Sequence, residues 1–146
     1  MQYTLNIIFN QDKTKVLMQL KDRSIYAGKY NFPGGKMQEQ DNNDLKQCAF
    51  RELLEETGIK PEDVPDMTWI GTIMLPNGCT EGHLDEQSEL GFFAMTVRQE
   101  IPKQQPGETE ALQWCQVENV PKLRQLNLLA GDGELELFLN KAVKSM

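Results

Sequence analysis

Three glutamates in one short segment, Glu52, Glu55 and Glu56, constrain this chain more than any other feature of its sequence. At about 100° per residue, their spacing places all three side chains within one arc of a helix surface. A glycine follows at position 58, and helices commonly end in a left-handed glycine. The sequence therefore predicts a helix that carries carboxylates on one face and stops at Gly58.

The residues before and within this helix define its start and its other faces. Asn43 or Asp44 can cap the N-terminus, because a short side-chain acceptor there satisfies a free backbone N–H. Small and apolar residues share the arc of the glutamates, namely Leu45, Cys48 and Ala49. Bulky apolar residues fall on the opposite side, namely Phe50, Leu53 and Leu54. We therefore expect the main apolar stripe of the helix to lie behind the glutamates.

Three carboxylates on one helix face repel one another unless a cation lies among them. Hard divalent ions such as Mg²⁺ take oxygen ligands, usually a few carboxylates together with water and substrate phosphates. The alternative is a solvated acidic face, which is what a run of charge usually represents. A glycine pair upstream, the Arg51-Glu52 dipeptide and the terminating Thr57-Gly58-Ile59 stand in one frame with the glutamates and favour a metal site.

This frame resembles the signature of the Nudix hydrolases, G-x5-E-x7-R-E-U-x-E-E-x-G-U, in which U is an aliphatic residue. Every defined position of its second half matches, from Arg51 to Ile59. The segment Pro33-Gly34-Gly35-Lys36 matches the usual lead-in. The resemblance is close at residues 33–59 and looser over most of the remaining chain.

The first half of the signature differs from the pattern. Fifteen residues lie between Gly35 and Arg51, where the pattern has thirteen. The place of the first glutamate is held by Asp41 when counted forward from Gly35, and by Asn43 when counted back from Arg51. We therefore expect a loop with a two-residue insertion that lacks this glutamate.

The resemblance implies the roles of the matching residues. Mg²⁺, or Mn²⁺ in its place, would be held by Glu52, Glu55, Glu56 and the carbonyl of Gly35. Arg51 can pair with Glu55 at i+4 spacing, so it is expected to orient a ligand and not to touch the substrate. The ion would bridge phosphates and lower the pKa of an attacking water.

The resemblance also suggests substrate-binding residues, each with a plainer alternative. Lys36 and Arg23 are candidates for phosphate oxygens, and Asn31 occupies the place of an asparagine that reads the base edge in the MutT-like group. Arg23 and Asn31 are equally explained as loop and turn residues. Asp132 matches an acidic base-binding residue before the last helix, or it is simply the cap of that helix.

An additional carboxylate is expected near the site. The family has an acidic residue near a later strand that binds metal or acts as a base, and Glu110 is our candidate, with Glu108 behind it. The long loop after residue 75 could also supply one, although solvent exposure explains its charges better: Glu81, Asp85, Glu86 and Glu89.

Apolar and β-branched runs predict the remaining elements, beginning with a hairpin. Alternating strands and helices favour a mixed sheet between helices, which the resemblance sharpens to a Nudix-type α/β/α sandwich of class α/β, with residues 1–146 as one domain. The expected strands are residues 3–9, 15–20, 68–75, 91–97 and 108–114, and the final helix is residues 134–144.

Composition excludes several classes of function. A net charge of −7 in 146 residues argues against a general grip on nucleic acid. Three widely spaced cysteines, without a C-x-x-C pair, favour reduced thiols, and one histidine excludes two-histidine mechanisms. We find no signal-peptide pattern and no apolar run long enough for a membrane span. These features favour a cytoplasmic protein. A small nucleotide substrate is what the resemblance implies, and we expect a monomer or homodimer.

Three hypotheses about function remain open. The first is a MutT-like pyrophosphatase that cleaves a nucleoside triphosphate, such as an oxidised purine nucleotide, to monophosphate and pyrophosphate. The second keeps the chemistry and takes ADP-ribose or another nucleotide sugar as substrate. The third is a nucleotide-binding domain without catalysis, which the altered loop suggests.

Overall fold

The computed structural model describes residues 1–23, 25–75, 88–98 and 110–145 of the chain. Several residues that the sequence singled out lie outside this part, namely Glu81, Asp85, Glu86 and Glu108. Within the described ranges, no helix is long and apolar enough to cross a membrane.

A seven-stranded mixed sheet forms the centre of the structure. β1 runs parallel to β6, and every other strand pair is antiparallel. The main order is β3-β2-β1-β6-β5, with β4 added to β1 and β7 added to β2. The strands are β1 (Gln2–Phe9), β2 (Lys15–Leu20), β3 (Tyr30–Asn31), β4 (Gly34–Lys36), β5 (Thr68–Leu75), β6 (Ser88–Thr96) and β7 (Leu112–Gln116).

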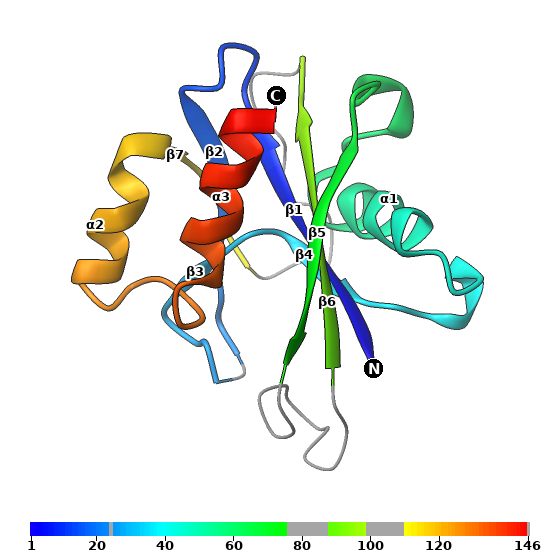
Figure 1. Ribbon diagram of the computed structural model, residues 1–146, viewed down its shortest axis with the longest axis horizontal. Helices are drawn as coiled ribbons and strands as arrows, with labels where there is room; N and C mark the ends of the chain where they lie inside the picture. Colours follow the sequence, from blue (N-terminus) through cyan, green and yellow to red (C-terminus); the bar gives the residue numbers. More distant parts are fainter. Residues whose placement is uncertain (24, 76–87, 99–109, 146) are drawn as a thin grey trace.

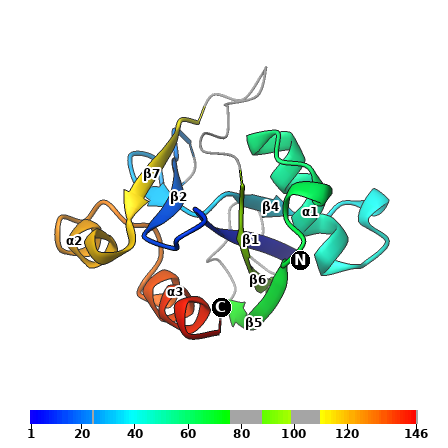
Figure 2. The same ribbon diagram turned by 90° about the horizontal axis from the view of Figure 1, so that it is seen from above.

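Helices cover both faces of the sheet (Figure 1). α1 (Leu45–Thr57) lies on one side, whereas α2 (Val120–Gln125) and α3 (Glu134–Ser145) lie on the other, as the view from above also shows (Figure 2). Short 3₁₀ turns occupy Glu39–Asp41, Pro61–Asp63 and Val117–Asn119. The expected α/β/α arrangement with a mixed sheet is therefore confirmed.

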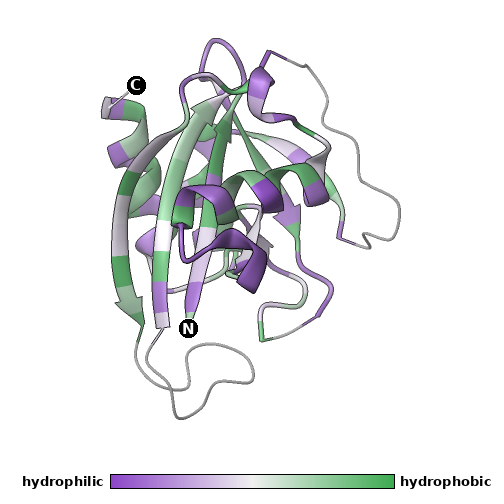
Figure 3. Cartoon of the chain, turned by 90° about the vertical axis from the view of Figure 1, so that its right-hand side faces the viewer, coloured by the Kyte–Doolittle hydropathy of each residue, from purple (hydrophilic) through white to green (hydrophobic). Residues whose placement is uncertain are grey.

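Each side of the sheet has its own apolar core. The core under α3 includes Phe92 and Phe138, whose rings stack with centroids 4.1 Å apart. The core under α1 includes Leu17, Leu53 and Phe93. Figure 3 shows the apolar colour concentrated on the strands and the polar colour on turns and outer helix surfaces. Burial on both faces explains why β1, whose last three residues are apolar and fully buried, is an inner strand.

The predicted elements agree with the structure, apart from several boundaries and the short elements β3, β4 and α2. The strands at 15–20 and 68–75 have the predicted bounds, and that at 3–9 starts one residue earlier. The strand expected at 91–97 begins already at Ser88, and the one expected at 108–114 is placed at Leu112–Gln116. The six-residue helix α2 was not predicted, because Pro121 and its short length resemble a turn.

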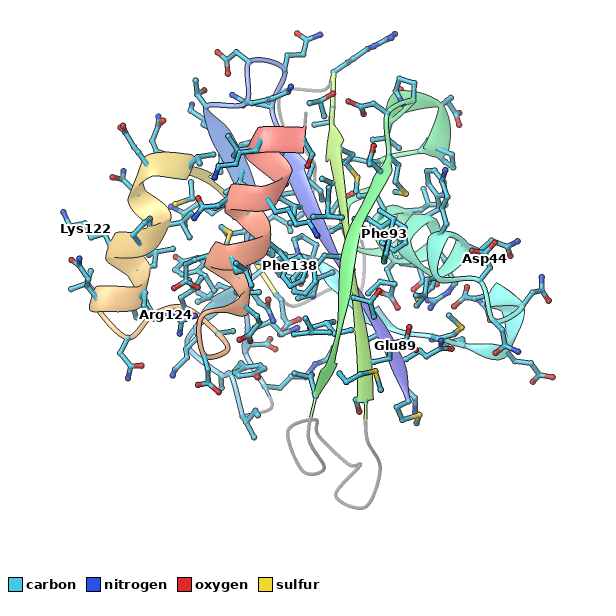
Figure 4. The ribbon with its side chains drawn as sticks, in the orientation of Figure 1. Asp44, Glu89, Phe93, Lys122, Arg124 and Phe138 are labelled. Carbon is cyan, nitrogen blue, oxygen red and sulfur yellow. The ribbon has the colours of Figure 1, made fainter. Side chains whose placement is uncertain are left out.

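The caps of α1 are as expected, but its faces are not. Asp44, labelled at the start of α1 in Figure 4, accepts a hydrogen bond from the Lys46 N–H at 2.9 Å, and Gly58 is left-handed with φ of 75°. The prediction that the bulky residues lie behind the glutamates was wrong for Leu54, which is 46% exposed. The buried face of α1 carries the carboxylates of Glu52 and Glu56.

Candidate active site

Arg51 is the centre of a hydrogen-bond network at one end of the sheet. Its Nε and Nη2 donate to the two carboxylate oxygens of Asp41 at 2.8 and 2.9 Å. Its Nη1 donates to both Glu52 and Glu55 at 3.0 Å, and Nη2 also reaches the Lys36 carbonyl at 2.9 Å. One guanidinium thus ties α1 to β4 and to the loop between them. The expected Arg51–Glu55 pair is present as part of this larger network.

Asp41 locates the insertion in the loop. It is 2% exposed, and its pKa is held below the usual range chiefly by the hydrogen bonds from Arg51. Asp41 therefore occupies the place of the first glutamate of the signature when this place is counted forward from Gly35. The next two residues, Asn42 and Asn43, have φ of 54° and 58°. Two consecutive left-handed residues provide the extra length between Asp41 and Arg51.

Glu52 and Glu56 form a buried carboxylate pair on the sheet-facing side of α1. Their side chains contact each other, and the two residues are 8% and 6% exposed. Burial raises the pKa of both, and burial together with the neighbouring Glu52 raises the pKa of Glu56 to about 9. Glu56 therefore retains a proton at neutral pH unless a cation compensates its charge.

The backbone of Gly35 lies close to the carboxylate of Glu52. A Cβ at this position would lie against the carboxylate of Glu52, 2.5 Å from its carboxyl carbon. Only a residue without a side chain allows the Glu52 carboxylate to approach β4 so closely. The structure therefore brings Gly35, Arg51, Glu52 and Glu56 together, as the sequence predicted.

Glu55 occupies a different position from the other two glutamates. Its side chain is 51% exposed, and its described partner is Arg51. Within residues 1–23, 25–75, 88–98 and 110–145, no three acidic, cysteine or histidine side chains are grouped as a metal-binding cluster. The described geometry brings two of the three glutamates together and leaves Glu55 at the edge.

Gln19 of β2 and Lys21, which directly follows this strand, also act on the carboxylate pair. Gln19 is fully buried and its amide lies close enough to Glu56 to stabilise the ionised carboxylate, although neither amide atom meets the geometry of a hydrogen bond. The charge of Lys21 also favours ionised Glu56. Sequence reasoning missed Gln19, whose only signal was a polar residue inside an apolar strand.

Glu110 lies beside these residues and outside the carboxylate pair. It is 3% exposed, accepts a hydrogen bond from the Lys21 ammonium at 2.8 Å and receives the Asp22 N–H at 3.0 Å. The carboxylate is thus already held by a cation and a backbone donor.

A pocket of about 240 Å³ is lined in part by β4, the strand that the sequence suggested as a glycine turn. Three predicted substrate residues line it: Arg23, Asn31 and Lys36. The Asn31 oxygen accepts the Phe32 N–H at 2.8 Å, which leaves its amide N–H groups as donors for a ligand. The walls also include Tyr3, Leu5, Tyr26, Leu90, Gly131 and Glu134.

Asp132 is not among the residues that line this pocket. It is exposed, and the helix begins at Glu134, so Gly133 and not Asp132 precedes the first helical residue. The Asp132 N–H instead donates to the Glu134 carboxylate at 2.9 Å. The acidic side chain that faces the pocket is Glu134, which sequence reasoning assigned only to the helix.

The sequence was compared with models of known protein families. The family model described as NUDIX domain matches residues 2–133. The chain belongs to the Nudix family. The family assignment made from residues 33–59 is thereby confirmed, and it places the chain among hydrolases that generally use divalent metal ions.

Known relatives of this Nudix chain differ in their ligands. The peroxisomal coenzyme A diphosphatase ndx-8 of Caenorhabditis elegans is 35% identical over 54 residues, which are 36% of this chain and 23% of that protein. The NUDIX domain of Shewanella oneidensis NrtR, solved with ADP ribose, has a TM-score of 0.74 at 19% identity, covering 99% of this chain and 87% of that one.

A third comparison supports the MutT-like resemblance. The MutT protein of Bacillus halodurans has a TM-score of 0.66 at 27% identity, covering 94% of this chain and 78% of that structure. MutT-type Nudix proteins are therefore among the structural neighbours.

Proposed function

We propose that this Nudix protein hydrolyses the diphosphate linkage of a nucleotide with the help of Mg²⁺, with Mn²⁺ as a substitute. The preferred substrate is a nucleoside triphosphate, such as an oxidised purine nucleotide, which yields monophosphate and pyrophosphate. The observation that carries this proposal is that the buried Glu52–Glu56 pair and the pocket meet at β4. Gly35 of this strand lies against the Glu52 carboxylate, and the strand also lines the pocket. Reaction centre and nucleotide site would then share the Gly34–Lys36 strand.

The carboxylate pair fits a divalent cation. Burial raises the pKa of Glu52 and Glu56, the Gln19 amide beside them has no hydrogen-bond partner among the described residues, and Gly35 leaves room for Glu52. We propose that Glu52, Glu56 and the Gly35 carbonyl hold the ion, with Glu55 at its edge. Such an ion, when bound, neutralises phosphate charge and lowers the pKa of bound water.

The remaining residues are assigned by position. Arg51 positions Glu52, while Lys36 and Arg23 bind phosphate oxygens at the pocket, where both are exposed cations. Asn31 donates to the base edge. Glu110 acts through Lys21, which it holds at 2.8 Å. Asp132 lies outside the pocket lining, next to its residue Gly131, and a role for it in binding the base remains a proposal from the sequence alone.

A second candidate is a nucleotide-sugar substrate. The NrtR domain that resembles this chain was solved with ADP ribose, and the same carboxylates and glycine turn would serve its diphosphate. The two substrates carry different groups beyond the cleaved diphosphate bond, pyrophosphate in one and ribose phosphate in the other, so the products distinguish them. A domain that binds nucleotides without cleavage is the third outcome.

The test is incubation of the protein with Mg²⁺ and a panel of nucleoside triphosphates, oxidised purine nucleotides and ADP-ribose, followed by chromatography of the products. Pyrophosphate with monophosphate supports the leading proposal, and ribose phosphate with AMP supports the second. Binding without cleavage under Mg²⁺ or Mn²⁺ contradicts both enzymatic proposals.

Glu56→Gln provides a sharper check of the site. Losing one of two paired ligands should lower turnover at least about a hundredfold, with folding intact, because the amide is close to the carboxyl in shape. Glu62→Gln is the matched control, since Glu62 is an exposed carboxylate of a 3₁₀ turn. Turnover that stays at the wild-type level in Glu56→Gln removes the metal-site assignment.

We also propose that residues 1–146 act as one domain, as a cytoplasmic monomer or homodimer, with a small nucleotide and not a nucleic acid as partner. The net charge of −7 supports the choice of ligand. Light scattering measures the oligomeric state, and a shift of labelled DNA or RNA at physiological salt would contradict the last point.

A further inference from the structure

We propose that Arg124 of α2 is a positioning residue that fixes one wall of the nucleotide pocket and thereby sets substrate affinity without touching substrate. This inference rests on the proposed function, because it takes the pocket to be the nucleotide site. In Figure 4, Arg124 is labelled between α2 and α3, on the side of the sheet opposite α1. The distances below place its guanidinium against the loop that forms this wall.

Five hydrogen bonds use the whole guanidinium. Nε and Nη2 donate to the two oxygens of Glu136 at 2.8 and 2.9 Å. Nη1 donates to the carbonyls of Leu129 at 3.1 Å and Gly131 at 2.6 Å, and Nη2 also reaches the Ala130 carbonyl at 2.9 Å. Three consecutive carbonyls therefore converge on one side chain, which fixes the orientation of three successive peptide planes.

The same loop is fixed on its other side by β3. The Tyr30 N–H donates to the Leu128 carbonyl at 2.7 Å, and the Ala130 N–H donates to the Tyr30 carbonyl at 2.9 Å. Tyr30 precedes Asn31, which is a pocket residue. The loop is thus held between Arg124 and the strand that carries the proposed base contact.

This loop forms part of the pocket wall. Ala130 and Gly131 line the pocket, as do Glu134 and Leu135 at the start of α3. Gly131 is left-handed with φ of 74°, and a Cβ there would collide with the Glu134 carboxylate. Arg124 holds the Gly131 carbonyl. Replacement of Arg124 would therefore release Gly131, which lies between the rest of the loop and Glu134.

The ion pair alone does not require arginine. Arg124 keeps the pKa of Glu136 below its usual range through hydrogen bonding, and a lysine would also supply a positive charge there. Only the planar fork of a guanidinium can serve two carboxylate oxygens and three carbonyls at once. The residue type therefore points to the carbonyl contacts as the specific role of Arg124.

The experiment compares three variants with the wild-type chain, using steady-state kinetics on its best substrate, calorimetric binding of the product monophosphate, and unfolding temperature. Arg124→Gln should raise KM and the product Kd about tenfold, as expected when a binding wall must be ordered, with kcat within about twofold. Arg124→Lys should keep most of the thermal stability while KM stays raised. Glu136→Gln should lower the unfolding temperature while KM changes little.

Lys122→Gln is the matched control, because it removes one exposed cation two residues away on the same helix. It should leave every parameter unchanged. An unchanged KM and Kd in both Arg124 variants overturns the inference, even if their unfolding temperatures fall. Because Arg124→Lys retains a charge opposite Glu136, it serves as the test if Arg124→Gln does not fold.

The outcomes separate this inference from the proposed function. If wild-type protein binds nucleotides and cleaves none, the hydrolytic proposal fails, and the Kd values still test Arg124. If wild-type protein cleaves substrate and the Arg124 variants bind it normally, only the inference fails. A wild-type chain that binds no nucleotide of the panel overturns both.

Discussion

Gly35 is the residue of β4 that lies against the Glu52 carboxylate of α1. Its missing side chain is what allows the Glu52 carboxylate to approach the strand, since any Cβ would collide with it. The glycine is therefore required by a close approach and not by a turn with positive φ. Its replacement tests whether the position of one carboxylate controls the reaction.

Gly35→Ala should reduce turnover about a hundredfold, because displacement of a reacting constellation by about 1 Å has that effect. The added methyl forces Glu52 to rotate away from Gly35, and the Arg51–Glu52 hydrogen bond at 3.0 Å is lost with it. Turnover under saturating Mg²⁺ and circular dichroism are measured together. A variant that is folded and as active as wild type would show that Glu52 is free to move.

A substitution of Asp41 tests whether this residue has a structural role in the altered first half of the signature. Asp41→Asn should destabilise the protein by about 3 kcal/mol, because it leaves the guanidinium of Arg51 without the partner that holds it on two sides. Arg51 is 11% exposed, so water does not replace this contact fully. Urea unfolding measures the change, and Asp41→Glu is the control that restores the charge. Equal stability of Asp41→Asn and wild type would contradict a structural role for the pair.

At the level of the elements, the loop between Asp41 and α1 differs most from the expected pattern. Asn42 and Asn43 both have left-handed backbones, which asparagine tolerates better than most residues. The Asn42→Ala, Asn43→Ala double variant should lose about 2 kcal/mol, since each alanine meets an unfavourable backbone conformation. The Asn42→Gly, Asn43→Gly variant is the control, and urea unfolding compares the two. A double alanine variant as stable as wild type would exclude strain at this insertion.

The strands and α1 could be predicted because their signals are local. Apolar runs defined β1, β2 and β5, and Asp44 and Gly58 marked the ends of α1. Tertiary contacts decided what the sequence missed. The burial of Gln19 against Glu56 depends on which face of β2 meets α1. Glu134 lines the pocket at the end of the loop whose Gly131 carbonyl accepts a hydrogen bond from Arg124, a contact between residues that are distant from the signature in sequence.

At the scale of the whole molecule, the two sides of the sheet have separate tasks. Charged groups gather between the sheet and α1, where Arg51, Glu52 and Glu56 meet, whereas the pocket is completed by the loop before α3. The strands β1, β4 and β6 belong to both regions, because each contacts α1 and each has residues that line the pocket. A residue list in sequence order cannot reveal this division, because β4 and α3 are separated by about a hundred residues.

The stability of the whole protein should therefore depend on pH and metal together. In the metal-free fold Glu56 has a pKa of about 9, raised from 4.5, so between these values the folded state holds a proton that the unfolded chain has released. Stability contributed by this proton is present at low pH and is lost as pH rises through the folded pKa. The unfolding temperature in EDTA should fall from about pH 5 to about pH 9.

Mg²⁺ should reverse this trend, because the ion binds ionised carboxylates and competes with the proton. The gain in unfolding temperature caused by saturating Mg²⁺ should thus be larger at about pH 9 than at about pH 5. Glu56→Gln should flatten the metal-free profile and remove most of the gain, while Glu62→Gln should change neither. Protonation of Glu52 and Glu56 at low pH should weaken Mg²⁺ binding to this pair. A Mg²⁺ effect that is greatest at low pH would therefore mean that the ion binds at another site.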